Sequence, residues 1–217
     1  MNERQSYRLA ALGAGLMLLV SLIDPFTGIV NSLLGVQEAW WVLGMLVPRV
    51  LLLAGWLLQI PFVRMVRVRF GEHPRLWRYG MTAVVLEVAA WLFSGLSSVF
   101  PAEAGNYSPL SGPVLLGYLV MAVATLAMLL YSYFFTQLFT FCRRVQSRSA
   151  LTFLPMAAAF LLLLDALAGD LAFFMETPPA ADHTAYFVRQ VMSYSWVFIA
   201  RMLLLVYFSV NIFKARS

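Results

Sequence analysis

Long apolar segments dominate the sequence and restrict the chain to folds that a lipid bilayer can hold. They cover roughly residues 9–33, 40–63, 79–100, 113–141, 150–174 and 187–213. A helix needs about 20 apolar residues to cross the hydrocarbon core, so each segment is long enough to span it. Backbone groups in lipid must bond internally, which leaves helices or a closed barrel. Polar and apolar positions do not alternate in these segments, and this excludes the barrel.

Composition leaves little room for anything besides these segments. Of 217 residues, 62% are hydrophobic and 12% are charged, whereas about a quarter are charged in ordinary soluble domains. We therefore predict one all-α integral membrane domain over residues 1–217, folded as a bundle of six transmembrane helices. Small residues at Ala11, Gly15, Gly44 and Gly55 are expected to let these helices approach closely.

The basic residues gather on alternate connections between the apolar segments. Twelve of the fifteen Lys and Arg residues precede the first segment, follow the second or fourth, or end the sequence. They are Arg4, Arg8, Arg64, Arg67, Arg69, Arg75, Arg78, Arg143, Arg144, Arg148, Lys214 and Arg216. The remaining connections carry Glu38, Glu103, Glu176, Asp182 and His183, with Arg189 as the basic exception. The positive-inside rule then predicts a multi-pass protein of the bacterial cytoplasmic (inner) membrane with both termini in the cytoplasm.

The cytoplasmic basic surface has a second interpretation besides topology. It comprises Arg64, Arg67, Arg69, Arg75, Arg78, Arg143, Arg144 and Arg148. Such clusters anchor a protein on anionic lipid, and this is the interpretation that we favour. A docking surface for a cytoplasmic protein is the alternative, and nucleic-acid binding is not expected because topology already accounts for the charge.

The first apolar segment contains a potential break at Asp24-Pro25. Proline removes a backbone donor and disfavours helical geometry in the residue before it. The segment is therefore either one long kinked span or a short span followed by a re-entrant piece, and we favour the kinked span.

Ionisable residues inside the predicted spans are the sharpest chemical signal, because a charge in hydrocarbon is costly. The six are Asp24, Arg49, Glu87, Asp165, Asp170 and Arg201. Asp24 and Asp170 lie toward the outer ends of their spans, whereas the other four are expected near mid-membrane. One interpretation pairs Arg49 and Arg201 with Glu87 and Asp165 to hold the bundle together. The other is a polar cavity that passes a proton or ion, or that grips an anionic or zwitterionic substrate.

The first and last helical hairpins share a pattern that suggests a weak internal repeat. Spans one and five read Leu-Ile-Asp24-x-x-x-Gly and Leu-Leu-Asp165-x-x-x-Gly. Spans two and six read Arg49-Val-Leu-Leu-Leu and Arg201-Met-Leu-Leu-Leu. Duplication of a two-helix unit is a common way to build membrane bundles, and chance similarity of leucine-rich text is the alternative.

Residue types that cofactor or catalytic sites need are scarce. His73 and His183 both fall in predicted loops, which argues against an intramembrane haem, a helical zinc protease site and a rhomboid-like serine protease. The single cysteine, Cys142, excludes an internal disulfide and any multi-cysteine metal site. We predict no metal and no cofactor.

Three functions remain compatible with these features. The first is an integral or accessory subunit of a larger membrane assembly, with protein partners or other copies of the chain around it in the bilayer. The second is a small transporter or proton- or ion-conducting protein that uses the buried acids and arginines. The third, less favoured, is a membrane enzyme acting on a lipid-linked substrate.

Overall fold

The computed structural model describes residues 2–34, 38–70, 74–99, 112–145, 149–175 and 183–215. Side chains are described for 2–23, 47–70, 75–94, 115–142, 151–168 and 194–215. Within these ranges the chain is helical and contains no strand. The helices are α1 Glu3–Leu34, α2 Glu38–Leu57, α3 Ile60–Arg69, α4 Pro74–Val99, α5 Gly112–Val145, the 3-10 turn η1 Ser149–Thr152, α6 Phe153–Met175 and α7 His183–Lys214.

Five helical stretches of the described chain are long and apolar enough to cross a membrane. They are Glu3–Ile23, Val47–Arg69, Arg75–Ser94, Leu115–Cys142 and Tyr194–Lys214. The described part of α6 supplies a shorter apolar helix, Phe153–Ala168. Large apolar side chains such as Leu126 and Phe160 are exposed, as expected of a surface that faces lipid. The prediction of an all-helical protein with membrane-spanning helices is confirmed at this level.

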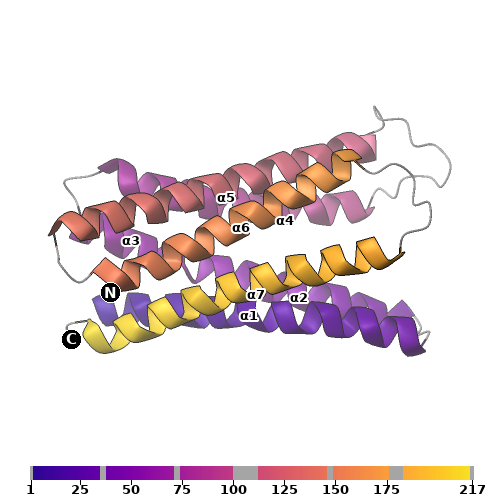
Figure 1. The fold of residues 1–217 in the computed structure, drawn as a ribbon, viewed down its shortest axis with the longest axis horizontal. Coiled ribbons are helices and arrows are strands. Elements are labelled where there is room, and N and C mark those ends of the chain that lie inside the picture. Colours follow the sequence, from indigo (N-terminus) through magenta and orange to yellow (C-terminus); the bar gives the residue numbers. More distant parts are fainter. Residues whose placement is uncertain are drawn as a thin grey trace.

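The helices run along the long axis of the molecule (Figure 1). The helix α1 packs on α2, the helices from α3 to α7 each pack on the next along the chain, and α7 returns to pack on α1. In Figure 1, α4, α5 and α6 form one side of the bundle, whereas α1, α2 and α7 form the other. Both termini lie at the same end of the bundle, beside the short helix α3. We call this end the basic end, because the arginines of α3 and of the start of α4 lie there.

The first helix passes through Asp24-Pro25 without ending, since α1 extends from Glu3 to Leu34. This continuity agrees with a single long span and not with a short span followed by a separate re-entrant piece. The start of α1 is capped by Asn2, whose Oδ1 accepts a hydrogen bond from the Gln5 amide at 2.9 Å. In return, Gln5 Oε1 accepts one from the Asn2 amide at 3.3 Å. This reciprocal arrangement satisfies backbone donors that the first turn of a helix leaves free.

The second predicted span, 40–63, contains an interruption of the helix. It divides into α2 and α3 at Leu58-Gln59. Pro61 has no amide hydrogen to donate to the carbonyl four residues earlier, so one bond of the α-helical ladder is missing here. The Gln59 amide instead bonds to Trp56 O at 3.0 Å, a tighter turn. A proline in the first turn then starts α3, where it is well tolerated.

The helix α3 extends beyond the predicted span and takes up part of the predicted basic loop. Arg64, Arg67 and Arg69 are therefore helical, and Arg75 and Arg78 lie in the first turns of α4. Arginines in the last turn of α3 interact favourably with the negative end of the helix dipole. The Arg67 guanidinium also stacks 4.7 Å from the centre of the Trp77 ring, which ties α3 to α4.

Candidate functional site

A buried glutamine at the α2–α3 break is the starting point of the candidate site. Gln59 is 1% exposed. The Tyr131 hydroxyl, from α5, donates to its Oε1, and its Nε2 donates to Met17 Sδ of α1 at 3.7 Å. The Tyr131 ring also packs edge-on against Trp56. The glutamine thus links three helices, and its amide finds the partners that a polar group in an apolar interior requires.

A partly buried arginine crosses from α7 to α1 close by. Arg201 Nη1 donates to Met17 O at 2.7 Å and to Ser21 Oγ at 2.6 Å. Ser21 is itself buried and also donates to Met17 O, at 3.4 Å. Met17 therefore contacts both polar groups, its sulfur meeting the glutamine and its carbonyl meeting the guanidinium.

Glu87, on α4, supplies an acidic group to this region. It is partly buried and interacts electrostatically with Arg201 and with Tyr131. The sequence predicts that Arg201 and Glu87 lie near mid-membrane. In the structure, neutral acceptors of α1 hold Arg201, and Glu87 is close enough to interact with it electrostatically. We call the set Ser21, Gln59, Glu87, Tyr131 and Arg201 the central polar cluster.

The central polar cluster lies deep in the bundle. Glu87 is thirteen residues from the start of α4 (74 to 87), and Arg201 is thirteen residues from the end of α7 (201 to 214). Tyr131 is fourteen residues from the end of α5 (131 to 145). At about 1.5 Å per residue these positions are roughly 20 Å from the basic end. That depth is near the centre of a membrane about 40–45 Å thick including its headgroups.

An aromatic layer separates the central polar cluster from the basic end. It consists of Tyr7, Phe62, Phe134, Phe135, Tyr207 and Phe208, all buried. The Phe62 ring lies at its centre, 5.0 Å from Phe208 and 5.6 Å from Tyr7 between ring centres. Edge-to-face and tilted pairs at such distances are favourable beyond the burial of their surface. The layer joins α1, α3, α5 and α7.

A cavity of about 1220 Å³ lies on the other side of the aromatic layer, at the basic end. Its lining combines apolar residues with charged groups from three helices. Glu3, Arg64, Arg69 and Lys214 are its charged members. Glu3 and Arg69 form an ion pair between α1 and α3. Proceeding from the basic end, the bundle thus contains a cavity, an aromatic layer and the central polar cluster.

The remaining predicted intramembrane charges are Arg49, Asp165, Asp24 and Asp170. Arg49 presents its backbone carbonyl to Trp91 Nε1 at 2.9 Å. Since Trp91 is one turn beyond Glu87 in α4, Arg49 lies farther from the basic end than the cluster. Asp165 is partly buried on α6, a helix that packs on α5 and α7. The side chains of Asp24 and Asp170 lie outside the described residues.

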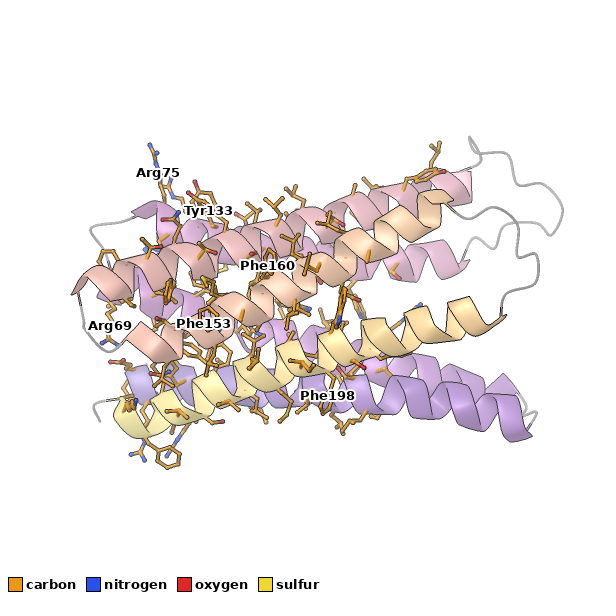
Figure 2. The ribbon with its side chains drawn as sticks, in the orientation of Figure 1. Arg69, Arg75, Tyr133, Phe153, Phe160 and Phe198 are labelled. Carbon is orange, nitrogen blue, oxygen red and sulfur yellow. The ribbon has the colours of Figure 1, made fainter. Side chains whose placement is uncertain are left out.

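The predicted basic surface divides between the cavity and the exterior. Arg64 and Arg69 line the cavity. Arg75 and Arg78 are exposed, and Figure 2 shows Arg75 at the same end of the molecule as Arg69. The helix α5 extends through Arg143 and Arg144, beyond the predicted boundary at 141. The side chains of these two arginines and all of Arg148 fall outside the described residues.

Sequence reasoning missed the uncharged members of the cluster. Ser21, Gln59 and Tyr131 were not among the predicted site residues, because attention to formal charge passes over them. Gln59 carried a usable signal: it is a polar residue two positions before a proline inside an otherwise apolar run. A helix interrupted in a membrane needs nearby groups to satisfy its freed backbone. By contrast, Thr136 and Thr140 donate only to carbonyls of their own helix, at 2.8 and 2.9 Å.

Among the described residues, no group of three or more His, Cys, Asp or Glu side chains is placed to hold a metal ion. Comparison with protein-family models, with curated proteins and with solved structures found no match in any of the three.

Proposed function

We propose that the chain spans the bacterial cytoplasmic membrane six times, with both termini and the cavity on the cytoplasmic side. The five long apolar stretches support this number together with α6, which is 23 residues long over Phe153–Met175. The concentration of arginine at one end of the bundle supports the orientation through the positive-inside rule.

We further propose that the protein conducts protons or couples proton movement to transport of a small solute. The observation that carries this proposal is the central polar cluster, buried at a helix break beneath a cavity. Broken helices at mid-membrane commonly form the ion and substrate sites of transporters. Ionisable residues at this depth are rare unless they line a pathway or pair with one another. Glu87 is the group of the cluster that can take up and release a proton, while Arg201 supplies a fixed positive charge beside it.

Two hydrogen bonds to α1 hold Arg201 in position near Glu87. Here the guanidinium donates to a backbone carbonyl and a serine hydroxyl, which hold it in place whatever the state of Glu87. A fixed cation next to an acid is suited to an acid that changes its charge during a cycle.

Proton flux in proteoliposomes tests this proposal. We expect the purified protein to let protons enter vesicles that contain a pH-sensitive dye when a potassium potential drives them. Glu87→Gln removes the titratable group. Flux is therefore expected to fall at least tenfold, because a positioned acid or base typically accelerates proton transfer by this factor or more. The matched control is Thr136→Val, which removes a hydroxyl bonded only within its own helix and should leave the flux unchanged. Absence of flux in the unaltered protein, or equal flux in Glu87→Gln, would refute proton conduction.

The alternative of an accessory subunit is distinguished by purification in mild detergent from the native host. Stoichiometric companions on size-exclusion chromatography and mass spectrometry would favour that role. In that case Glu87→Gln is expected to lower the amount of assembled complex and not a flux. A monodisperse particle without companions would favour an autonomous transporter.

A further inference from the structure

The cavity at the basic end has a lining that matches one class of ligand. We propose that it binds an amphipathic anion, with an apolar chain or ring over the aromatic layer and a phosphate or carboxylate group at Arg64, Arg69 and Lys214. A substrate role for this ligand rests on the proposed transport function, whereas binding in the cavity does not.

The floor of the cavity is apolar and rigid. Phe62 is 1% exposed, and Tyr7 and Tyr207, which also line the cavity, are 6% and 3% exposed. The ring centres of Tyr7 and Tyr207 are 6.4 Å apart, and each ring contacts Phe62. These packed rings close the cavity toward the interior, whereas Met65 and Phe70 of the same lining are partly exposed and offer apolar area to a ligand. A fully hydrated inorganic ion would leave this surface unused.

The charged members of the lining are mostly positive. Arg64, Arg69 and Lys214 face a single acid, Glu3, in this lining. Guanidinium groups bind phosphate and carboxylate through paired, charge-assisted hydrogen bonds. An anionic headgroup is therefore the expected polar partner, and a cation is not.

The volume also fits a ligand larger than a simple ion. Ligand pockets usually measure roughly 300–1,000 Å³, and this cavity measures about 1220 Å³. It can hold a polar headgroup together with part of an alkyl chain. Its position at the basic end places it where lipid headgroups and soluble anions can both reach it, so both sources are included in the test.

The Glu3–Arg69 ion pair predicts that one charge-removing substitution strengthens ligand binding. Glu3 already occupies the Arg69 guanidinium with a carboxylate of the chain itself, so it competes with an incoming anion for that group. Removing the Glu3 charge should strengthen ligand binding, whereas removing the charge of Arg64 or of Lys214 should weaken it. A site that bound only through apolar contact would respond to neither change.

The only cysteine of the sequence, Cys142, lines the cavity and serves as a reporter. The full-length protein is reconstituted in phosphatidylcholine nanodiscs, and the rate of Cys142 labelling by a neutral maleimide is measured against octyl phosphate concentration. Bound ligand covers the thiol, so labelling is expected to slow in a saturable manner. Octyl glucoside, with the same chain and no charge, is the matched control ligand and should protect at least tenfold more weakly, since charge-assisted hydrogen bonds are the stronger ones. Isothermal titration calorimetry provides a second readout that needs no thiol reaction.

Variants connect binding to the proposed residues. Arg64→Gln and Lys214→Gln are each expected to raise the apparent dissociation constant for octyl phosphate about tenfold, because each removes one charge-assisted hydrogen bond. Glu3→Gln is expected to lower it. Arg75→Gln is the matched control, since Arg75 is an exposed arginine at the same end that is absent from the cavity lining, and it should change nothing.

The source of the anion is resolved by changing the lipid. Protection of Cys142 in nanodiscs that contain phosphatidic acid, without added octyl phosphate, would identify a membrane lipid as the ligand. Protection by octyl phosphate alone would identify a soluble amphipathic anion. Protection by neither, or equal effects of Arg64→Gln and Arg75→Gln, would overturn the proposal. Proton flux is not measured in this experiment, so the ligand and the transport function can fail separately.

Discussion

At the scale of single residues, the interior of this bundle is organised by neutral hydrogen bonds as much as by charge. Gln59 and Tyr131 are far apart in the sequence, and they form a hydrogen bond in a part of the bundle that water does not reach. Water cannot replace a lost partner at this depth, so either side chain is costly without the other. This dependence should be visible in the energetics of paired substitutions.

A double-mutant cycle on Gln59 and Tyr131 tests that dependence. Tyr131→Phe leaves Gln59 Oε1 without its donor and should lower the free energy of unfolding in detergent by about 1–2 kcal/mol. An unsatisfied buried group costs ~1–3 kcal/mol, and hydrogen bonds within membranes contribute less than that on average. Gln59→Leu should cost a similar amount. In the double variant both polar groups are gone, so its loss should be clearly smaller than the sum of the two. Strict additivity would show that the hydrogen bond contributes nothing.

At the scale of helices, α1 and α2 approach each other closely through a pair of glycines. A Cβ added to Gly13 would lie 2.6 Å from the Gly55 carbonyl oxygen, and one added to Gly55 would lie 2.9 Å from the Gly13 carbonyl oxygen. Small residues at such points let two backbones pack against each other in a membrane. Of the positions expected from the sequence, Gly55 has this role. Gly15 does not, since an added Cβ there would meet only Leu205 Cδ1 at 4.0 Å.

Alanine substitutions at two neighbouring glycines of α1 test this contact. Gly13→Ala forces apart two backbones and should lower the free energy of unfolding by about 1–3 kcal/mol, the usual cost of overpacking. Gly15→Ala is the matched control in the same helix and adds a methyl group where there is space. It should leave the stability unchanged or slightly higher, because alanine favours the helix more than glycine does. Thermal unfolding in detergent measures both, and an equal effect of the two changes would contradict the packing argument.

The helices also bear on the predicted repeat of two hairpins. The helix α2 ends at Leu57, eight residues after Arg49 (49 to 57), whereas α7 continues for thirteen residues beyond Arg201 (201 to 214). The two arginine-bearing helices therefore differ in continuity. The similar sequences around Arg49 and Arg201 do not extend to the features that build the site. Those features are the break after α2 and the contacts from Arg201 to α1.

At the scale of the whole molecule, the basic end gathers the termini, the cavity and the arginines of α3 and α4 (Figure 1). A cluster of arginines resists translocation, so this end should remain in the cytoplasm. The helix α7 packs on α1. The start of α1 and the end of α7 lie on the same side of a membrane only if the number of spans is even. The orientation and the span number can therefore be tested together.

Reporter fusions test this topology. Green fluorescent protein at the C-terminus should be fluorescent, because it folds in the cytoplasm and not after export to the periplasm. Alkaline phosphatase inserted after Asn106, between the third and fourth predicted spans, should be active, because it needs an oxidising compartment for its disulfides. A fluorescent C-terminal fusion combined with an inactive insertion at Asn106 would show that the number of spans between these points is even instead of odd.

The sequence alone determined the class of this protein, because the length of apolar runs and the one-sided distribution of arginine are properties of composition along the chain. It also indicated that Glu87 and Arg201 face the interior of the bundle, because a charged side chain in an apolar span is costly in contact with lipid. The helix break before Pro61, the meeting of Gln59 with Tyr131 and the fastening of Arg201 to Ser21 were decided only by the tertiary structure. Each depends on how a helix is rotated about its axis and which neighbour it meets, and those choices come from the fit of side chains across several helices at once.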